Sequence, residues 1–118
     1  MIKILIVCDN INEISKLKRS FGDEYKVSAS NSAENALNIL QNKTTDIALF
    51  HAGADISRLF AFYRLVRQNP ETENQPIIFV VEEVVLNIIS DTITLEDAEV
   101  VVAPVSLENI QNAVDSLI

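Results

Sequence analysis

Short apolar runs rich in β-branched residues alternate along the chain with longer segments in which apolar residues recur every three or four positions. A continuous apolar run is typical of a strand buried on both faces of a parallel sheet, and the longer spacing is typical of an amphipathic helix. The pattern therefore predicts strands that alternate with helices. The five predicted strands are residues 2–7, 25–29, 46–50, 76–81 and 100–102.

The segments between these strands begin with residues that cap helices. Asn10 is followed three residues later by Glu13, a spacing that resembles a capping box, and an amphipathic stripe comes after it. Ser32, Ser57 and Ser106 are the predicted caps of three later helices. Because capping and periodicity agree, we expect helices in all four segments.

The segment at residues 82–95 carries two conflicting signals. Many of its residues are β-branched, which favours a strand, but the spacing of its apolar residues fits a helix better. We predict a helix here. Five strands and five helices in alternation then predict one α/β domain spanning residues 1–118, with a single doubly wound, five-stranded parallel sheet and right-handed crossovers.

Composition and charge narrow the class of protein. The chain has 118 residues, of which 48% are hydrophobic and 22% charged, as expected for one globular domain. Its net charge of −8 repels a phosphate backbone, which disfavours direct nucleic-acid binding. No apolar run is long enough to span a membrane. The lone Cys8 cannot form an internal disulfide and is predicted to be a small buried hydrophobe, so we expect a cytoplasmic location.

Chemistry in open parallel sheets gathers beyond the carboxyl ends of the strands. That rule selects the positions that end or follow four of the predicted strands: Cys8 with Asp9, His51, Val81 with Glu82, and Ala103 with Pro104. The turn after the first strand contains no glycine, so the phosphate-binding fingerprint of dinucleotide folds is missing. We expect no nucleotide or flavin cofactor.

Several segments together resemble a known family. Residues 4–9 look like the first strand of a response regulator receiver domain, which ends in two acids, and residues 46–51 look like its third strand, which ends in the phospho-accepting Asp. Residues 76–81 resemble the fourth strand, which ends in Ser or Thr, and residues 100–104 the fifth, which ends in Lys-Pro. Residues 67–70 match the end of the third helix. The resemblance to this CheY-like superfamily covers essentially the whole chain and implies the flavodoxin-like fold of the receiver type.

The residues that accept a phosphoryl group in this family are mostly replaced here. His51 stands in place of the accepting Asp, and Cys8 replaces one of the two metal-holding acids, which leaves Asp9. Val81 replaces the hydroxyl residue, and Ala103 replaces the phosphate-pairing Lys. If the alignment of the first turn is shifted by one residue, Asp9 and Asn10 occupy the positions of the two acids. That pair also contains only one carboxylate. The resemblance therefore implies a degenerate phosphoacceptor pocket in which Mg²⁺ binding is weak or absent.

The family's switch residue is also replaced, because Val100 occupies the place of its usual aromatic side chain. Our leading hypothesis is a pseudo-receiver of two-component signal transduction and phosphorelay systems that is not an enzyme and acts through protein contacts, independently of phosphorylation. Its partner is a protein or an output domain. The candidate interaction face is Val85, Ile88 and Ile89, and the resemblance implies a possible homodimer through the fourth helix, fifth strand and fifth helix.

Three alternatives assign chemistry to the same pocket. His51 accepts a phosphoryl group on nitrogen in the first, and Cys8, Asp9 and His51 bind a transition metal such as Zn²⁺ in the second. In the third, Cys8 and His51 act as nucleophile and base, which requires a solvent-facing thiol within hydrogen-bond reach of the imidazole. His51 is also the sole histidine of the chain and is open to a role in pH sensing.

Overall fold

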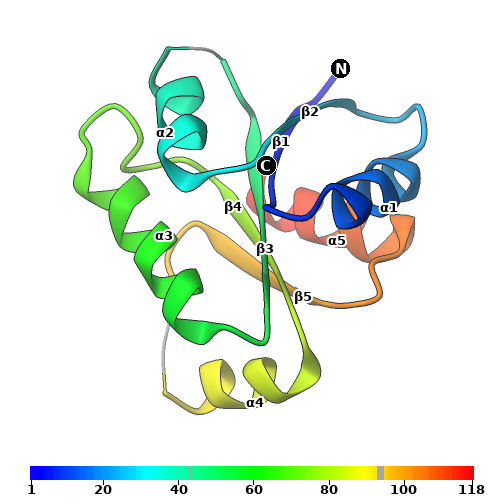
Figure 1. Cartoon of the computed structure of the whole chain (residues 1–118), viewed down its shortest axis with the longest axis vertical. Helices are drawn as coiled ribbons and strands as arrows, with labels where there is room; N and C mark the ends of the chain where they lie inside the picture. Colours follow the sequence, from blue (N-terminus) through cyan, green and yellow to red (C-terminus); the bar gives the residue numbers. More distant parts are fainter. Residues whose placement is uncertain (43, 93–94) are drawn as a thin grey trace.

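The computed structural model describes residues 1–42, 44–92 and 95–118 and shows one parallel sheet with helices on both faces (Figure 1). The strand order is β2-β1-β3-β4-β5, and every neighbouring pair is parallel. This confirms the predicted fold class. The strands are β1 (Lys3–Val7), β2 (Lys26–Ser30), β3 (Ile47–Gly53), β4 (Ile77–Val81) and β5 (Ala98–Val102).

Two hydrophobic clusters, one on each side of the sheet, form the core. The helices α2, α3 and α4 pack on one face, and α1 and α5 pack on the other. Alternate strand residues serve the two sides, so Leu5 and Val7 enter the first cluster while Ile4 and Ile6 enter the second. The helices are α1 (Ile11–Phe21), α2 (Ala33–Asn42), α3 (Ile56–Gln68), α4 (Glu83–Thr92) and α5 (Leu107–Leu117).

Three of the predicted helix caps are confirmed. The Asn10 side chain accepts hydrogen bonds from two backbone N–H groups of α1, and the hydroxyl oxygens of Ser32 and Ser106 each accept one at the start of α2 and α5. The predicted cap of α3 is wrong. That helix begins at Ile56, and the Asp55 carboxylate accepts from the backbone N–H of Arg58 at 3.1 Å, so Ser57 lies inside the first turn.

The third strand also differs from its predicted bounds. The predicted strand stops at residue 50, but β3 continues to Gly53 through a shift in its pairing with β4 between His51 and Gly53. Gly53 has a φ of 60°, a left-handed conformation that suits glycine. His51 therefore lies within β3, opposite Val80, and does not follow the strand as predicted. The other four strands differ less from the predicted bounds: β1 and β4 begin one residue later, β2 is shifted by one residue at both ends, and β5 begins two residues earlier.

The segment at residues 82–95 contains α4, which confirms the predicted helix. Ile93, one of the apolar residues behind that prediction, lies outside the described residues. Among the helices of the described ranges, none combines the length and the apolar character needed to cross a membrane.

Candidate functional site

The carboxyl ends of β1, β3, β4 and β5 meet at one edge of the sheet, next to the start of α1. A cavity of about 430 Å³ opens there, between α1 and the segment that follows β5. His51, Glu13, Lys16, Glu82 and Ala103 line it, together with apolar side chains. The structure thus brings two of the predicted pocket residues, His51 and Ala103, to one cavity.

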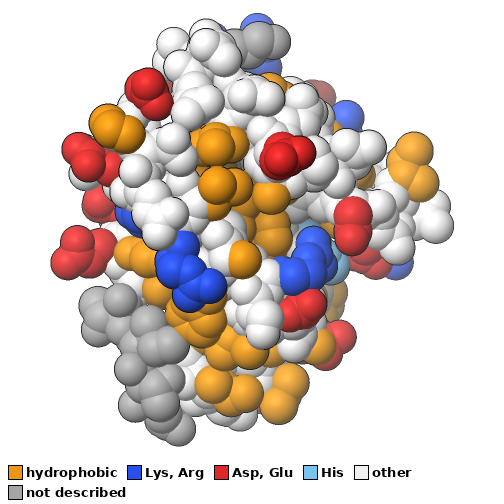
Figure 2. All heavy atoms as spheres, turned by 60° about the vertical axis from the view of Figure 1, so that its left-hand side comes forward, with side chains coloured by type: hydrophobic (Ala, Val, Ile, Leu, Met, Phe, Trp, Pro, Cys, Tyr) orange, Lys and Arg blue, Asp and Glu red, His pale blue; other side chains and the backbone are white. Residues whose placement is uncertain are grey.

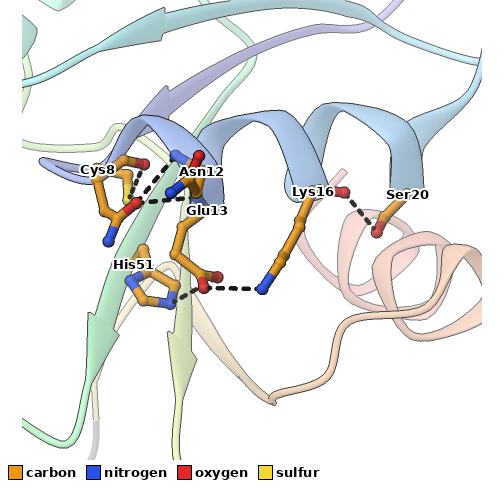
Figure 3. Close-up of polar contacts among 7 residues, drawn as sticks. Cys8, Asn12, Glu13, Lys16, Ser20 and His51 are labelled. Atoms are coloured by element: carbon orange, nitrogen blue, oxygen red, sulfur yellow. Dashed lines mark hydrogen bonds and ion pairs between the residues drawn. The ribbon is translucent and has the colours of Figure 1, made fainter.

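His51 faces a partner that the sequence did not reveal. Its Nε2 atom lies 3.8 Å from the Glu13 carboxylate, whose other oxygen lies 3.4 Å from the Lys16 ammonium (Figure 3). Our sequence interpretation placed Glu13 in a capping box, with its side chain directed back toward Asn10. In the structure, Glu13 instead connects the imidazole of β3 to the ammonium of α1.

Cys8 is buried, as predicted, and belongs to the cluster beneath α1 and α5. Its Sγ atom donates a weak hydrogen bond to the Asn10 carbonyl at 3.6 Å (Figure 3). Burial raises the pKa of the Cys8 thiol, the nearby charges of Asp9 and Glu13 raise it further, and the bond to the Asn10 backbone opposes them. A protonated, buried thiol is a poor nucleophile and a poor metal ligand.

Asp9 does not line this cavity. Its side chain is 70% exposed, and its carboxylate lies 3.8 Å from the guanidinium of Arg58, a residue of α3. Among the residues that the structure describes, no three His, Cys, Asp or Glu side chains are grouped so that they can hold a metal ion. The Zn²⁺ alternative therefore lacks geometric support.

Val81 and Ala103 are adjacent, since the Ala103 N–H donates to the Val81 carbonyl at 2.9 Å. The Val81 side chain is buried in the cluster beneath α3 and α4, so it offers only apolar contact. Val100 lies opposite Phe79 in the register of β5 with β4 and packs, partly buried, against the same cluster. These three side chains supply neither a hydrogen bond nor a charge to the cavity edge.

The candidate interaction face needs a correction. Val85 and Ile89 are only 1% and 5% exposed, because they lie one helical turn apart on the side of α4 that packs against the sheet. Ile88 is 48% exposed and Val84 is 58% exposed. We call Val84 and Ile88 the α4 patch. Figure 2 shows hydrophobic side chains gathered toward the end of the molecule where α4 lies.

Comparison with known proteins identifies the fold. No protein-family model matches the sequence, and no curated protein matches it either. Solved structures match along the whole chain. The chemotaxis response regulator CheY4 of Vibrio cholerae is 19% identical, with a TM-score of 0.80 over 100% of this chain and 99% of that one.

Two further structures have the same arrangement. The signal receiver domain of an HD domain-containing protein from Pseudomonas fluorescens Pf-5 is 15% identical, with a TM-score of 0.76 over 98% of this chain and 93% of that one. A response regulator receiver domain protein from Clostridium thermocellum is 18% identical, with a TM-score of 0.75 over 99% and 94% of the two chains. The chain therefore has the fold of a CheY-like receiver domain.

Proposed function

We propose that this chain is a receiver-like signalling domain that acts through protein contacts and independently of its own phosphorylation. One observation carries the proposal: His51, which the sequence resemblance assigns to the phosphoacceptor position, has its Nε2 atom 3.8 Å from the carboxylate of Glu13. The fold likeness to response regulators supports a signalling role. The single cysteine and the net charge of −8 support a cytoplasmic location and contacts with protein, not nucleic acid.

Phosphoryl transfer needs a nucleophile and positive charge or hydrogen-bond donors for the phosphoryl oxygens. A phosphoryl group on the Nε2 atom of His51 would add negative charge beside Glu13. Ala103 and Val81 provide no side-chain donor to offset that charge. Lys16 is the one cation among the described residues that line the cavity, and Glu13 already engages it.

Incubation with phosphodonors tests this proposal. The protein is mixed with Mg²⁺ and either acetyl phosphate or phosphoramidate, and its intact mass is measured at neutral pH because phosphohistidine is labile in acid. A CheY-type receiver treated in parallel is the positive control. We expect unmodified protein throughout. A phosphorylated species would overturn phosphorylation independence, and its loss in His51→Ala would assign the acceptor to His51.

The contact surface that we propose is the α4 patch, with a second copy of the chain as its partner. Two large apolar side chains on one exposed helix face favour association. Light scattering after size exclusion should show a dimer fraction that grows with concentration and falls in Val84→Glu and Ile88→Glu. Ile11→Glu is the matched control, since Ile11 is also exposed but belongs to α1. A monomer at all concentrations would overturn self-association through this patch.

We further propose that the domain is not an enzyme and needs no Mg²⁺. The buried Cys8 thiol, whose pKa is raised, supports the first statement. The exposure of Asp9 and its pairing with Arg58 support the second. A calorimetric titration with Mg²⁺ should show no binding, and a saturable heat signal that disappears in Asp9→Asn would contradict this expectation.

A further inference from the structure

A second cavity, of about 490 Å³, lies on the other side of the sheet, between α2 and α3. It reaches the carboxyl end of β1 at Val7 and the middle of β3 at Phe50. The chain leaves β1 toward β2 on one side and later enters β3 on the other, so this is the point where the strand order reverses. Ligands of open α/β sheets bind at such switch points, and the volume is in the range of small-molecule sites.

The body of the cavity is apolar and partly aromatic. The rings of Phe50 and Phe62 stack at a centroid distance of 4.5 Å and an angle of 16°, and both rings line the cavity. Leu65 and the small side chain of Ala61 form the α3 wall. Figure 2, which brings α2 and α3 forward, shows hydrophobic side chains running down this face between charged ones. Such a lining suits a flat aromatic group.

The mouth of the cavity carries one charge of each sign. The Arg58 guanidinium lies 5.5 Å from the centroid of the Phe50 ring and 3.8 Å from the Asp9 carboxylate. The two side chains are 41% and 70% exposed, so this pair contributes little and is easily exchanged. A simple anion would be repelled by Asp9, and a simple cation by Arg58. A molecule with both charges can pair with each side chain at once.

We propose that this cavity binds a free aromatic α-amino acid. The carboxylate of the ligand pairs with Arg58, its ammonium group pairs with Asp9, and its ring packs against Phe62 and the α3 wall. Arginine suits the first contact because its planar fork matches a carboxylate. The site stands apart from the His51 cavity, so this proposal goes beyond the proposed function and does not depend on it.

Tryptophan is the probe for this site. The chain contains no tryptophan, so indole emission in a mixture comes from the ligand alone. Raising the protein concentration at constant tryptophan should increase the anisotropy of that emission to saturation. Indole-3-propionate lacks the ammonium group, and tryptamine lacks the carboxylate. Each should bind at least about tenfold more weakly, the effect of one lost charge-assisted hydrogen bond.

Variants locate the site on the protein. Arg58→Gln and Asp9→Asn should each weaken tryptophan binding about tenfold. Arg64→Gln is the matched control, since Arg64 is exposed on α3 and does not line the cavity. Ala61→Leu fills the cavity at an exposed position, so the variant keeps the fold, which circular dichroism verifies, and should lose binding.

Three results would overturn the proposal. The first is tryptophan anisotropy that stays at the free value at every protein concentration. The second is binding of indole-3-propionate or tryptamine as tight as that of tryptophan, which would exclude a site for both charges. The third is tryptophan binding that Arg58→Gln, Asp9→Asn and Ala61→Leu leave as strong as in the Arg64→Gln control.

Discussion

Replacing Arg67 with alanine tests whether one side chain of α3 anchors the loop that leads into β5. The Arg67 guanidinium donates hydrogen bonds to the carbonyl oxygens of Gln75 at 2.8 Å, Glu96 at 2.9 Å and Asp97 at 3.1 Å. It also lies 4.9 Å from the centroid of the Tyr63 ring. The Tyr63 hydroxyl in turn accepts a hydrogen bond from the Glu96 N–H at 3.0 Å. Arg67 and Tyr63 therefore both connect α3 to the loop that precedes β5.

The contacts of Arg67 set the expected loss. Each of its three hydrogen bonds is worth about 1 kcal/mol, less than is usual for a charged donor, because water can replace the arginine at the partly exposed carbonyls. The contact with the Tyr63 ring adds about 0.5–1 kcal/mol. The Nε atom of Arg67 is buried and finds no partner among the described residues, and its removal offsets part of the loss. We expect Arg67→Ala to lower the free energy of unfolding by about 3 kcal/mol.

For a domain of this length, that loss corresponds to a fall in Tm of about 12 °C. Urea unfolding followed by far-ultraviolet circular dichroism measures the free energy, and a thermal scan measures Tm. Arg64→Ala, at an exposed position of the same helix, should change stability by less than about 0.5 kcal/mol. Arg67→Lys keeps the charge but loses the planar fork, so it should fall between the two. A loss in Arg67→Ala below about 1 kcal/mol would refute the anchoring role.

Three further predictions concern corrected or buried positions. Val85→Lys places a charge in the core and should lower the free energy of unfolding in urea by at least about 3 kcal/mol. Val84→Lys, at an exposed position, should lower it by less than about 0.5 kcal/mol, and similar losses in the two variants would contradict the assigned orientation of α4. Asp55→Ala removes the cap of α3 and should lower the free energy of unfolding by about 1 kcal/mol, whereas Ser57→Ala should leave it nearly unchanged. The reverse ranking would show that Ser57 is the cap, as the sequence predicted. Burial raises the pKa of the Cys8 thiol, so iodoacetamide should alkylate it far more slowly in the native than in the urea-unfolded chain, and equal rates would disprove its protection. Because the unfolded thiol ionises first, Cys8 should also make the free energy of unfolding fall as pH rises above the ordinary thiol pKa.

Much of the fold is predictable because its signals are local. Apolar periodicity located the five strands and the helices, and short-range capping correctly identified Asn10, Ser32 and Ser106. Local signals failed where pairing decided the outcome. The continuation of β3 to Gly53 depends on its register with β4, and the cap of α3 is Asp55 and not Ser57.

The sequence predicted part of the location of the candidate site but not its contacts. Strand order and the receiver-like motifs placed Ala103 and His51 at one edge, and the structure brings both to one cavity. The inward face of α4 was misassigned, because β-branched residues occur on both of its sides and only packing against the sheet decides which ones are buried.

The amino-acid sequence by itself determined the order of strands and helices and the parallel sheet. Its resemblance to receiver domains predicts that His51, Val81 and Ala103 replace the acceptor, the hydroxyl residue and the lysine. Only the tertiary structure decided which side chains meet: Glu13 with His51, and Asp9 with Arg58. The reason is physical. Helix and strand signals arise between residues a few positions apart, whereas these pairs join separate elements, so their contacts depend on sheet order, register and helix rotation, which no local pattern encodes.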